Sequence, residues 1–494
     1  MIRCFYHLLL PLKLDWLPLY GSQEPLRAGQ RVEVNFSGKD YTAVVISEYH
    51  GSAAPDYRVL EISGTCPETV ADITPEELKL WKFISSYYQC TLGEVYAAAY
   101  PGYRIASEKK RRKKTASAES VQDFDRPESL RAGKPVLYRG KDRVGYYIER
   151  IRASIDAGFS ALVLVPELEY TFILQDALKA EFEDRLFLYD SLITPAKKRN
   201  LADDLRRADK PVVVVGTKSA LFLPFRKLGL IVVDEEQDAS HKQPEPAPRY
   251  NARDVAVVLG GIHGCQVILG TFTPSLESLY NCKTGKYTLV DGGSDPSCRV
   301  DVVDIAAERR KRGMEGDFSK KLTLKFGKLG GMLTVIRSYT SEQAVLDFFQ
   351  TRFPGLDPQI LTAQGAKYLT GTGALIAVLN ADSFFDRDDF RADEKALQNL
   401  RNLALHTERL FIQCTHSDHP VYQAIADISF EEELLAERKT FRMPPYTRLV
   451  DIKDRKTGQL VERKVLERDA SLEENKKKIS LQYGALYIID VDPL

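Results

Sequence analysis

The sequence predicts an α/β protein built on a doubly wound parallel sheet, with a small β-rich module before it. Between Lys134 and Gly293, strand-like runs alternate with helical segments; the runs include PVLYRG, SALVLVPE, KPVVVVGT and LGLIVVDEE. Uninterrupted apolar and β-branched runs are typical of parallel strands that are buried on both faces. Nearer the start, RVEVNFSGKDYTAVVISEY alternates apolar and polar residues on both sides of Ser37–Asp40, which indicates an antiparallel hairpin.

The composition is typical of a folded protein with several domains. Of 494 residues, 44% are hydrophobic, and 69 basic residues balance 69 acidic ones, so only local charge can select a polyanionic partner. The seven cysteines lie far apart without a Cys-x₂-Cys pair, which favours a reducing, cytoplasmic location over a disulfide framework or a zinc knuckle. No apolar run approaches the ~20 residues of a membrane span. We therefore expect no membrane contact.

Changes of pattern divide the chain into five expected parts. Residues 1–105 form the β-rich module, closed by a helix over TPEELKLWKFISSYY with Thr74 as its cap. Residues 106–133 form a polar linker with six consecutive basic residues. The linker is interpreted as a solvated connection between domains, as a segment that binds nucleic-acid phosphates, or as both. The α/β domain covers 134–293, a less regular α/β region 294–430, and a C-terminal domain 431–494. Within the fourth part, the charged run AAERRKRGMEGDFSKK is expected to form surface helix and loop.

One expected strand ends in carboxylates. Asp234, Glu235 and Glu236 directly follow the apolar run LGLIVV, and open α/β sheets bind their ligands at the carboxyl ends of strands. A nucleotide-hydrolysing site needs a phosphate cradle, a metal-holding carboxylate and a group that positions water. Asp234 would hold magnesium and Glu235 would position water in such a site. The alternative is structural, because acids at strand ends often cap the next helix.

Several blocks of sequence resemble the primosomal replication-restart helicases, the PriA (primosomal protein N′) family of helicase superfamily 2. The blocks are VLVPEL, VVVVGTKSALFLPFRKLGLIVVDEEQDASHKQ, PRYNARDVAV and TPSLES, in this order. WKFISSYYQCTLGEVYAAAYP is similar to the end of the family's N-terminal domain, which binds the 3′ end of a nascent strand. LNADSFFDRDDFRADEKALQ, LAERKTFRMPPYTRLV and IDVDPL resemble its second helicase lobe and C-terminal domain. The resemblance implies a superfamily 2 helicase-type sheet with a truncated second lobe, in a protein of DNA replication restart.

The segments that such helicases use for ATP turnover depart from the family pattern. The family's Gly-rich phosphate loop ends in Gly-Lys-Thr, whereas this chain has RGKDRVG, in which Gly140, Lys141 and Arg143 are the candidate nucleotide contacts. Val144 stands where a hydroxyl ligand of magnesium belongs. RNLALHTE replaces the family's Gly-Arg-Ala-Gly-Arg motif and leaves Arg401 as the candidate remnant of the arginine finger.

Other family features have no counterpart in the chain. These are the winged-helix module, the eight-cysteine zinc insertion and the segment that couples nucleotide to DNA, and Gln237 stands where the family has His. We therefore expect a degenerate helicase in which ATPase activity is lost or impaired. No cofactor and no zinc are expected, and ATP and magnesium would bind only if the altered site still holds nucleotide.

Residues that match the family's DNA-facing segments are Thr217 and Lys218 after one strand, and Arg249, Tyr250 and Arg253 in a later loop. Hydroxyl, ammonium and guanidinium groups suit phosphate contacts, and Tyr250 suits stacking on a base. The alternative for Arg253 is an internal ion pair with its neighbour Asp254.

The hairpin turn with Gly38 and Lys39 matches the family's pocket for the 3′ end. Elsewhere in that pocket the family has an aromatic or acidic pair, whereas this chain has Pro18-Leu19 before Tyr20.

Three hypotheses of function follow. The first is a non-catalytic protein that binds forked, branched or single-stranded DNA, with replication-restart or single-strand-binding proteins as candidate partners. The second is an active ATP-dependent 3′-to-5′ helicase with a non-standard phosphate loop, and the third is a decayed product that folds without a role. A metal site at His241, His416 and His419 is a weaker interpretation than helix capping by HSDH before Pro420.

Overall fold

The structure is a computed structural model, and it describes residues 4–50, 59–66, 71–100, 127–190, 193–293, 298–369, 371–385, 389–427, 429–484 and 486–493. The chain divides into two compact units. Unit 1 contains residues 1–136, 144–270 and 446–494, and unit 2 contains residues 137–143 and 271–445. Most of the expected basic linker, 106–126, lies outside the described residues, and the division into five parts stays a prediction.

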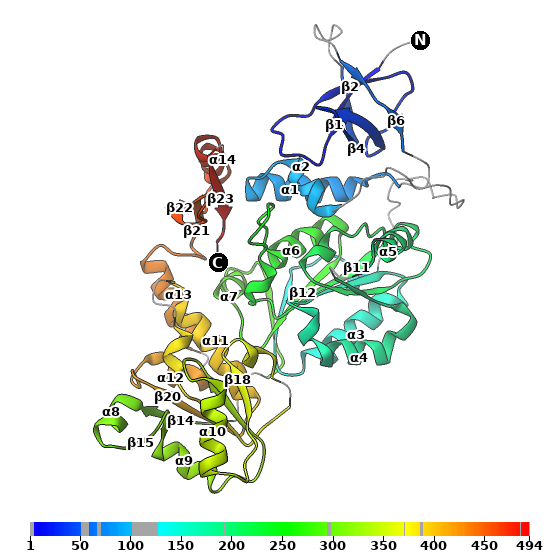
Figure 1. Ribbon diagram of the computed structural model, residues 1–494. Coiled ribbons are helices and arrows are strands. Elements are labelled where there is room, and N and C mark those ends of the chain that lie inside the picture. Colours follow the sequence, from blue (N-terminus) through cyan, green and yellow to red (C-terminus); the bar gives the residue numbers. More distant parts are fainter. Residues whose placement is uncertain are drawn as a thin grey trace. The chain divides into compact units, whose positions relative to one another are not determined.

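The N-terminal module of unit 1 is a twisted, mostly antiparallel sheet followed by two helices, with β2 and β5 as its parallel pair (Figure 1). The strands lie in the order β5-β2-β1-β4-β3-β6. Their bounds, with those of the helices, are β1 (Cys4–Leu9), β2 (Leu19–Ser22), β3 (Arg31–Phe36), β4 (Lys39–Glu48), β5 (Leu60–Glu61), β6 (Gly64–Thr65), α1 (Pro75–Tyr88) and α2 (Leu92–Ala99). The hairpin between β3 and β4 is confirmed, since Ser37 and Gly38 both have positive φ, at 52° and 78°, as a two-residue turn of this kind requires. Thr74 forms the expected capping box with Glu77.

The second part of unit 1 is a parallel sheet with helices on both faces. Its strands lie in the order β12-β11-β8-β10-β9, with α3 and α4 on one side and α6 on the other (Figure 1). The elements are α3 (Arg143–Asp156), β8 (Ser160–Leu164), α4 (Phe172–Phe182), β9 (Leu186–Tyr189), α5 (Pro195–Arg207), β10 (Val213–Gly216), β11 (Leu228–Asp234), α6 (Ala252–His263) and β12 (Gln266–Thr271). Every residue of β8, β10 and β11 is buried, as continuous apolar runs predict. This is the doubly wound sheet that the sequence predicts.

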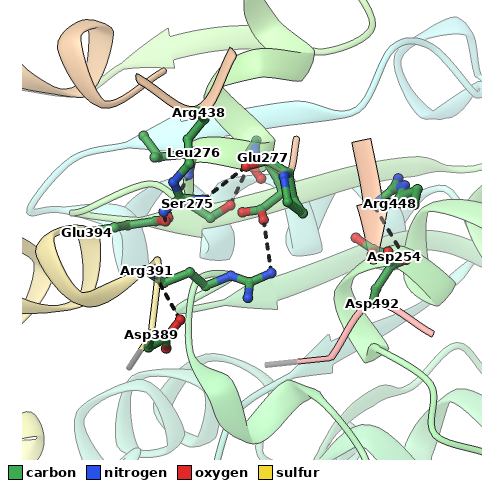
Figure 2. A network of polar contacts seen from close by, with 12 residues as sticks. Asp254, Ser275, Leu276, Glu277, Asp389, Arg391, Glu394, Arg438, Arg448 and Asp492 are labelled. Atoms are coloured by element: carbon green, nitrogen blue, oxygen red, sulfur yellow. Dashed lines mark hydrogen bonds and ion pairs between the residues drawn. The ribbon is translucent and has the colours of Figure 1, made fainter. Parts of the chain in front are cut away.

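The C-terminal part of unit 1 is a three-stranded antiparallel sheet with one helix. The strands lie in the order β22-β21-β23. The elements are β21 (Thr447–Asp454), β22 (Leu460–Glu467), α14 (Leu472–Tyr483) and β23 (Tyr487–Val491). A partly buried hydrogen bond joins this part to α1, since Tyr87 donates to Asp492 at 2.8 Å. Arg448 of β21 pairs with the same carboxylate at 3.5 Å (Figure 2).

Unit 2 is built on a second parallel sheet, in the order β14-β20-β19-β17-β18. Although the sequence predicts a less regular region here, all four strand pairs are parallel. Two neighbouring strands at the end of the seven-stranded sheet, β7 (Val136–Arg139) and β13 (Thr288–Asp291), have all residues but Val136 in this unit. The remaining elements are α7 (Leu276–Lys283), β14 (Arg299–Asp304), α8 (Ile305–Arg310), β15 (Met314–Glu315), β16 (Phe318–Ser319), α9 (Lys320–Phe326), β17 (Leu333–Arg337), α10 (Glu342–Arg352), β18 (Gln359–Thr362), β19 (Leu375–Val378), α11 (Ala392–Leu405), β20 (Arg409–Cys414), α12 (Pro420–Gln423) and α13 (Phe430–Thr440).

Buried ion pairs fasten the helices of unit 2 to one another. Glu394 of α11 accepts the backbone N–H of Leu276 at 2.9 Å and pairs with Arg438 of α13 at 2.8 Å (Figure 2). Arg391 pairs with Glu277 at 3.7 Å. The Glu394 carboxylate of α11 thus contacts both the first turn of α7 and the Arg438 side chain of α13. These contacts hold the three helices together.

None of the helices within the described ranges is long and apolar enough to cross a membrane.

Candidate functional site

The carboxylate at the end of β11 is bonded to a tyrosine. Tyr147, on the second turn of α3, donates its hydroxyl to Oδ1 of Asp234 at 2.9 Å. The tyrosine side chain is fully buried and Asp234 is 4% exposed. The carboxylate expected to hold magnesium therefore faces a phenol, which competes with a cation for the same oxygen.

Tyr147 also occupies the space above the neighbouring strand. A β-carbon built on Gly270, near the end of β12, would lie 1.5 Å from the Tyr147 hydroxyl oxygen. Gly270 is thus the residue that allows the ring to enter, since any larger side chain would collide with it. The tyrosine fills part of the sheet edge where such folds bind phosphates. Tyr147 was not predicted as a site residue, although it follows the RGKDRVG segment by two residues, because no local pattern shows that its hydroxyl reaches Asp234.

The connection between β7 and α3 is too short for a phosphate cradle. Only Gly140, Lys141 and Asp142 lie between the two elements. The backbone N–H of Gly140 donates to the carbonyl of Thr271 at 3.0 Å, so this donor is already engaged. Lys141 is exposed, and Val144 offers no ligand oxygen. The residues present do not fit a magnesium–nucleotide complex of the family type, and we assign no step to one.

The other acids of the DEE run are engaged within the protein. Gln237 donates to Glu235 at 2.7 Å. Glu236, which is 2% exposed, pairs with Arg253 at 3.2 Å, and Arg253 also donates to Asp254 at 2.8 Å. Burial acts to raise the pKa of Asp254, but the charge and hydrogen bond of Arg253 outweigh it and the net pKa is lowered. The ion pair considered as the alternative for Arg253 is thus present, and a DNA contact by this side chain would require it to leave two carboxylates.

Arg401 is a structural residue rather than an exposed finger. It is 5% exposed on α11, and its guanidinium forms a two-pronged pair with the buried carboxylate of Glu431. It also donates to the carbonyls of Ala424, Ile425 and Asp427 at 3.0, 3.3 and 2.7 Å. Every donor group is directed into unit 2, so the proposal of a finger remnant at Arg401 does not fit its surroundings.

The residues expected to face DNA on the parallel sheet of unit 1 do lie together. Thr217 precedes Lys218, whose ammonium donates to the carbonyl of Ser240 at 3.1 Å, and burial lowers its pKa. The hydroxyl of Tyr250 donates to the Lys218 carbonyl at 3.1 Å. Arg249 pairs with both carboxylate oxygens of Glu245 at 2.8 Å.

The expectation that Tyr250 stacks on a base needs correction. The residue is 3% exposed, and its ring packs edge-on against Phe222 with centroids 5.4 Å apart. The ring therefore supports the loop from within, and base stacking would require it to leave this packing.

Lys242 joins three parts of unit 1 at one buried ammonium, which we call the Lys242 junction. Its Nζ donates to the carbonyl of Arg249 in its own loop at 2.8 Å and to the carbonyl of Val491 in β23 at 2.7 Å. It pairs with Asp490 at 2.9 Å and lies 5.5 Å from the ring centroid of Tyr88 in α1. Because the Lys242 junction holds the carbonyl of Arg249, it sets the shape of the loop that carries two candidate DNA contacts.

In the N-terminal module, an exposed aromatic residue lies beside the hairpin turn. Trp16 is 58% exposed, and its ring lies 6.4 Å from that of Phe36, which pairs with Lys39 across the turn. Gly38 has open space around it and Lys39 is exposed. Tyr20 is instead buried and donates to the carbonyl of Asn35 at 2.8 Å. The aromatic residue of this surface is therefore Trp16, which the sequence analysis missed because strand patterns do not predict exposure in a loop.

The histidines have structural partners. His241 is buried and bonds through Nε2 to the carbonyl of Asp234 at 2.9 Å, and His419 caps α12 by accepting the N–H of Val421. The expected cap before Pro420 is confirmed. Among the residues that the structure describes, no three His, Cys, Asp or Glu side chains are grouped to hold a metal ion.

The burial of His241 predicts a pH dependence of stability. Burial lowers its pKa below the 6.5 of an exposed histidine, so the unfolded chain binds a proton that the folded protein resists. The free energy of unfolding should be unaffected well above pH 6.5 and should decrease as the pH falls through about 6.5 and below. Urea denaturation of the wild type and of His241→Gln measures this, and the loss should be smaller in the variant. Equal losses in the two proteins would contradict the assignment.

Comparison with known proteins identifies a family model, related sequences and solved structures that resemble this chain. Residues 8–101 match the family model of the PriA 3′ DNA-binding domain. Proteins named replication restart protein PriA are 32% identical to this chain over 302 residues in Helicobacter pylori (strain J99) and 34% identical over 192 residues in Bacillus subtilis (strain 168). The N-terminal part of the chain therefore resembles the PriA 3′ DNA-binding domain, and a larger part of it is similar to PriA proteins. The matches cover 59% and 38% of this chain, and 47% and 23% of the two relatives.

The chain therefore spans about half the length of the Helicobacter pylori relative. Solved structures with related architecture include RecG bound to a three-way DNA junction, with a TM-score of 0.38 and 13% identity over 63% of this chain and 44% of RecG. Yeast Dbp5 bound to RNA and ADP BeF3 has a TM-score of 0.40 and 12% identity, over 62% of this chain and 89% of Dbp5.

Proposed function

We propose that this protein is a PriA-family member of DNA replication restart that binds forked, branched or single-stranded DNA without turning over ATP. The proposed absence of ATP turnover rests on the hydrogen bond from the buried Tyr147 hydroxyl to Asp234. Magnesium would have to displace this phenol from a carboxylate that is 4% exposed. The same displacement would leave a buried hydroxyl without its partner.

Two further observations support the loss of turnover. The three-residue connection after β7 cannot surround a phosphate chain, and its Gly140 N–H is already bonded. Arg401 is held by Glu431 inside unit 2. An arginine finger alone is worth ~10³–10⁵ in rate in related phosphoryl-transfer enzymes. Losing the finger, the cradle and the metal-holding oxygen together would reduce hydrolysis to the rate of the uncatalysed reaction.

DNA binding is supported by different parts of the chain. The match to a 3′ DNA-binding domain covers the N-terminal module, where Gly38, Lys39 and the exposed Trp16 lie at one hairpin. Stacking of bases on an aromatic side chain beside a cation is a common way to hold single strands. We propose Trp16 as the stacking residue and Lys39 as a phosphate contact. Arg249 and Lys218 would contribute further contacts on the parallel sheet of unit 1.

ATP hydrolysis by the purified full chain, with and without forked DNA, tests the catalytic half. We expect turnover at the background of the assay and no difference from Asp234→Asn/Glu235→Gln, because the acids no longer serve a nucleotide. DNA-stimulated hydrolysis that disappears in the double variant would instead establish an active helicase with a non-standard phosphate loop.

Fluorescence anisotropy with the same fork tests the binding half. We expect salt-sensitive binding that ATP does not change, weakened by about 1–3 kcal/mol in Trp16→Ala, the usual effect of removing a stacking aromatic. Phe441→Ala is the matched control, since Phe441 is also largely exposed, at 65%. A wild-type protein without measurable affinity for the fork would favour the decayed product, and equal losses in the two variants would exclude Trp16 as the stacking residue.

A further inference from the structure

Unit 2 carries a compact group of basic side chains on the segment that the sequence analysis treated as surface helix and loop. All of its members are exposed, and we call the group the α8–α9 basic turn. It consists of Arg309, Arg310, Lys311, Arg312 and Lys320. The whole chain has a formal net charge of zero, so this local excess of positive charge is not a consequence of the overall composition.

The backbone of the basic turn is well defined. The N–H of Arg312 donates to the carbonyl of Arg309 at 3.0 Å, and the N–H of Gly313 donates to Glu308 at 2.8 Å, which ends α8 in a tight left-handed turn with φ of 53° at Arg312. The N–H of Lys320 then returns to the carbonyl of Gly313 at 2.8 Å. The first residue of α9 is therefore held beside the end of α8, and the five basic residues form one surface.

Nearby acids do not neutralise this surface. Glu308 pairs with Lys321 at 3.0 Å, Glu315 with Arg352 at 2.8 Å, and Asp317 accepts the hydroxyl of Thr340 at 2.8 Å. Within the described part of the chain, no carboxylate forms an ion pair with any of the five residues of the basic turn. Their charges are thus available to an external anion.

Stabilisation of α8 alone does not account for the group. Basic residues in the last turn of a helix interact favourably with its dipole, and Arg309 and Arg310 lie there. The favourable interaction with the helix dipole falls off within one turn. Lys311, Arg312 and Lys320 lie beyond the end of α8, and their charges repel those of Arg309 and Arg310. A group of like charges that costs repulsion in the isolated protein is typical of a surface that binds a polyanion.

We propose that the α8–α9 basic turn binds the phosphate backbone of a duplex arm of the DNA fork. Arginine side chains present a planar set of donors that matches phosphate oxygens, and clustered cations gain affinity by releasing counterions from duplex DNA. This inference rests on the proposed DNA-binding function and adds a contact in unit 2 to those proposed in unit 1. The surface carries no exposed aromatic side chain among its five members, which favours backbone contacts over base stacking.

The test compares salt dependence of binding for two DNA ligands, a fork with a duplex arm and a single strand. Arg309→Gln/Arg310→Gln/Arg312→Gln removes three charges in the full chain. With the fork, the slope of log Kd against log salt should fall by about two to three, since each phosphate contact on B-DNA contributes ~0.9. With the single strand, the slope should stay that of the wild type.

The matched control is Lys456→Gln/Lys477→Gln/Lys478→Gln, which removes three exposed charges from the C-terminal part of unit 1 and should leave both slopes unchanged. An unchanged fork slope in the arginine variant overturns the inference, because the basic turn would then serve an acidic protein segment or no ligand. Equal losses in the two triple variants would also overturn it, since net charge alone would explain them. Absence of fork binding by the wild type would instead contradict the proposed function itself.

Discussion

Replacement of Lys242 by methionine should lower the free energy of unfolding by about 3 kcal/mol or more, the loss typical of removing one partner from a buried ion pair. Methionine keeps most of the length of the side chain but none of its donors. The carbonyls of Arg249 and Val491, at 2.8 and 2.7 Å from the ammonium, would lose their donor in a position that is 2% exposed. Urea denaturation followed by tryptophan fluorescence measures the change, since Trp81 is buried in the same unit.

Lys453→Met is the matched control for this prediction. Lys453 pairs with the same carboxylate, Asp490, at 2.9 Å, but its side chain is 29% exposed. Partly exposed pairs contribute about 0–1 kcal/mol, so the control should lose far less stability than Lys242→Met. Equal losses would mean that Asp490 alone matters and that the two carbonyl contacts of Lys242 contribute nothing.

The Lys242 junction also bears on DNA binding. Lys242 holds the carbonyl of Arg249, and the N–H of Asn251 donates to the hydroxyl of Tyr88 at 3.1 Å. The Asn251 end of the segment is thus held by α1, and the Arg249 end is held by Lys242, which is itself bonded to Val491 of β23. The shape of this loop therefore depends on contacts with the N-terminal and C-terminal parts of unit 1.

Local chemistry made much of the fold predictable. The positive φ values of Ser37 and Gly38, the capping box of Thr74 and the buried strands that end at Gly216 and Asp234 all follow from residues close together in the sequence. The second parallel sheet was harder to predict. Its edge strands β14 and β18 are only partly buried, so their sequences lack the continuous apolar runs of β8 and β11.

The chemistry of the site depended on contacts between distant residues, which no local pattern encodes. Tyr147 meets Asp234 across 87 positions of sequence, and Lys242 meets Val491 across 249. Tyr250 has the residue type and position of a base-stacking group, but Phe222 and the Lys218 carbonyl take its ring and hydroxyl into the interior. Asp234 and Tyr250 were predicted to act on a ligand, and tertiary packing gives each of them a partner inside the protein.

The contacts around β11 are mutually consistent. Gly270 makes room for the Tyr147 ring, and the Tyr147 hydroxyl donates a hydrogen bond to the buried Asp234 carboxylate. A buried carboxylate without any partner would be costly. Each acid of the DEE run has a partner within the protein, so these residues can serve the structure in a protein that we propose to be without turnover.

Arg401→Met should lower the stability of unit 2 by about 3–5 kcal/mol, because it leaves the carboxylate of Glu431 buried without its cation. Glu431 is 6% exposed, and the carbonyls of Ala424, Ile425 and Asp427 would also lose donors. Thermal or urea denaturation of the full chain measures the loss. Arg409→Met is the control: Arg409 pairs with Asp301 at 3.0 Å, but its side chain is 28% exposed, so about 1 kcal/mol or less is expected.

A second substitution separates a structural role from a vestigial catalytic one. If Arg401 acts by compensating Glu431, then Arg401→Met/Glu431→Gln should recover part of the stability that the single variant loses, since a neutral amide is less costly to bury than a charge. An arginine retained for catalysis would behave differently: its removal would leave stability within about 1 kcal/mol of the wild type and change only turnover. The guanidinium is bonded to three carbonyls and one carboxylate inside unit 2, so the first result is the expected one.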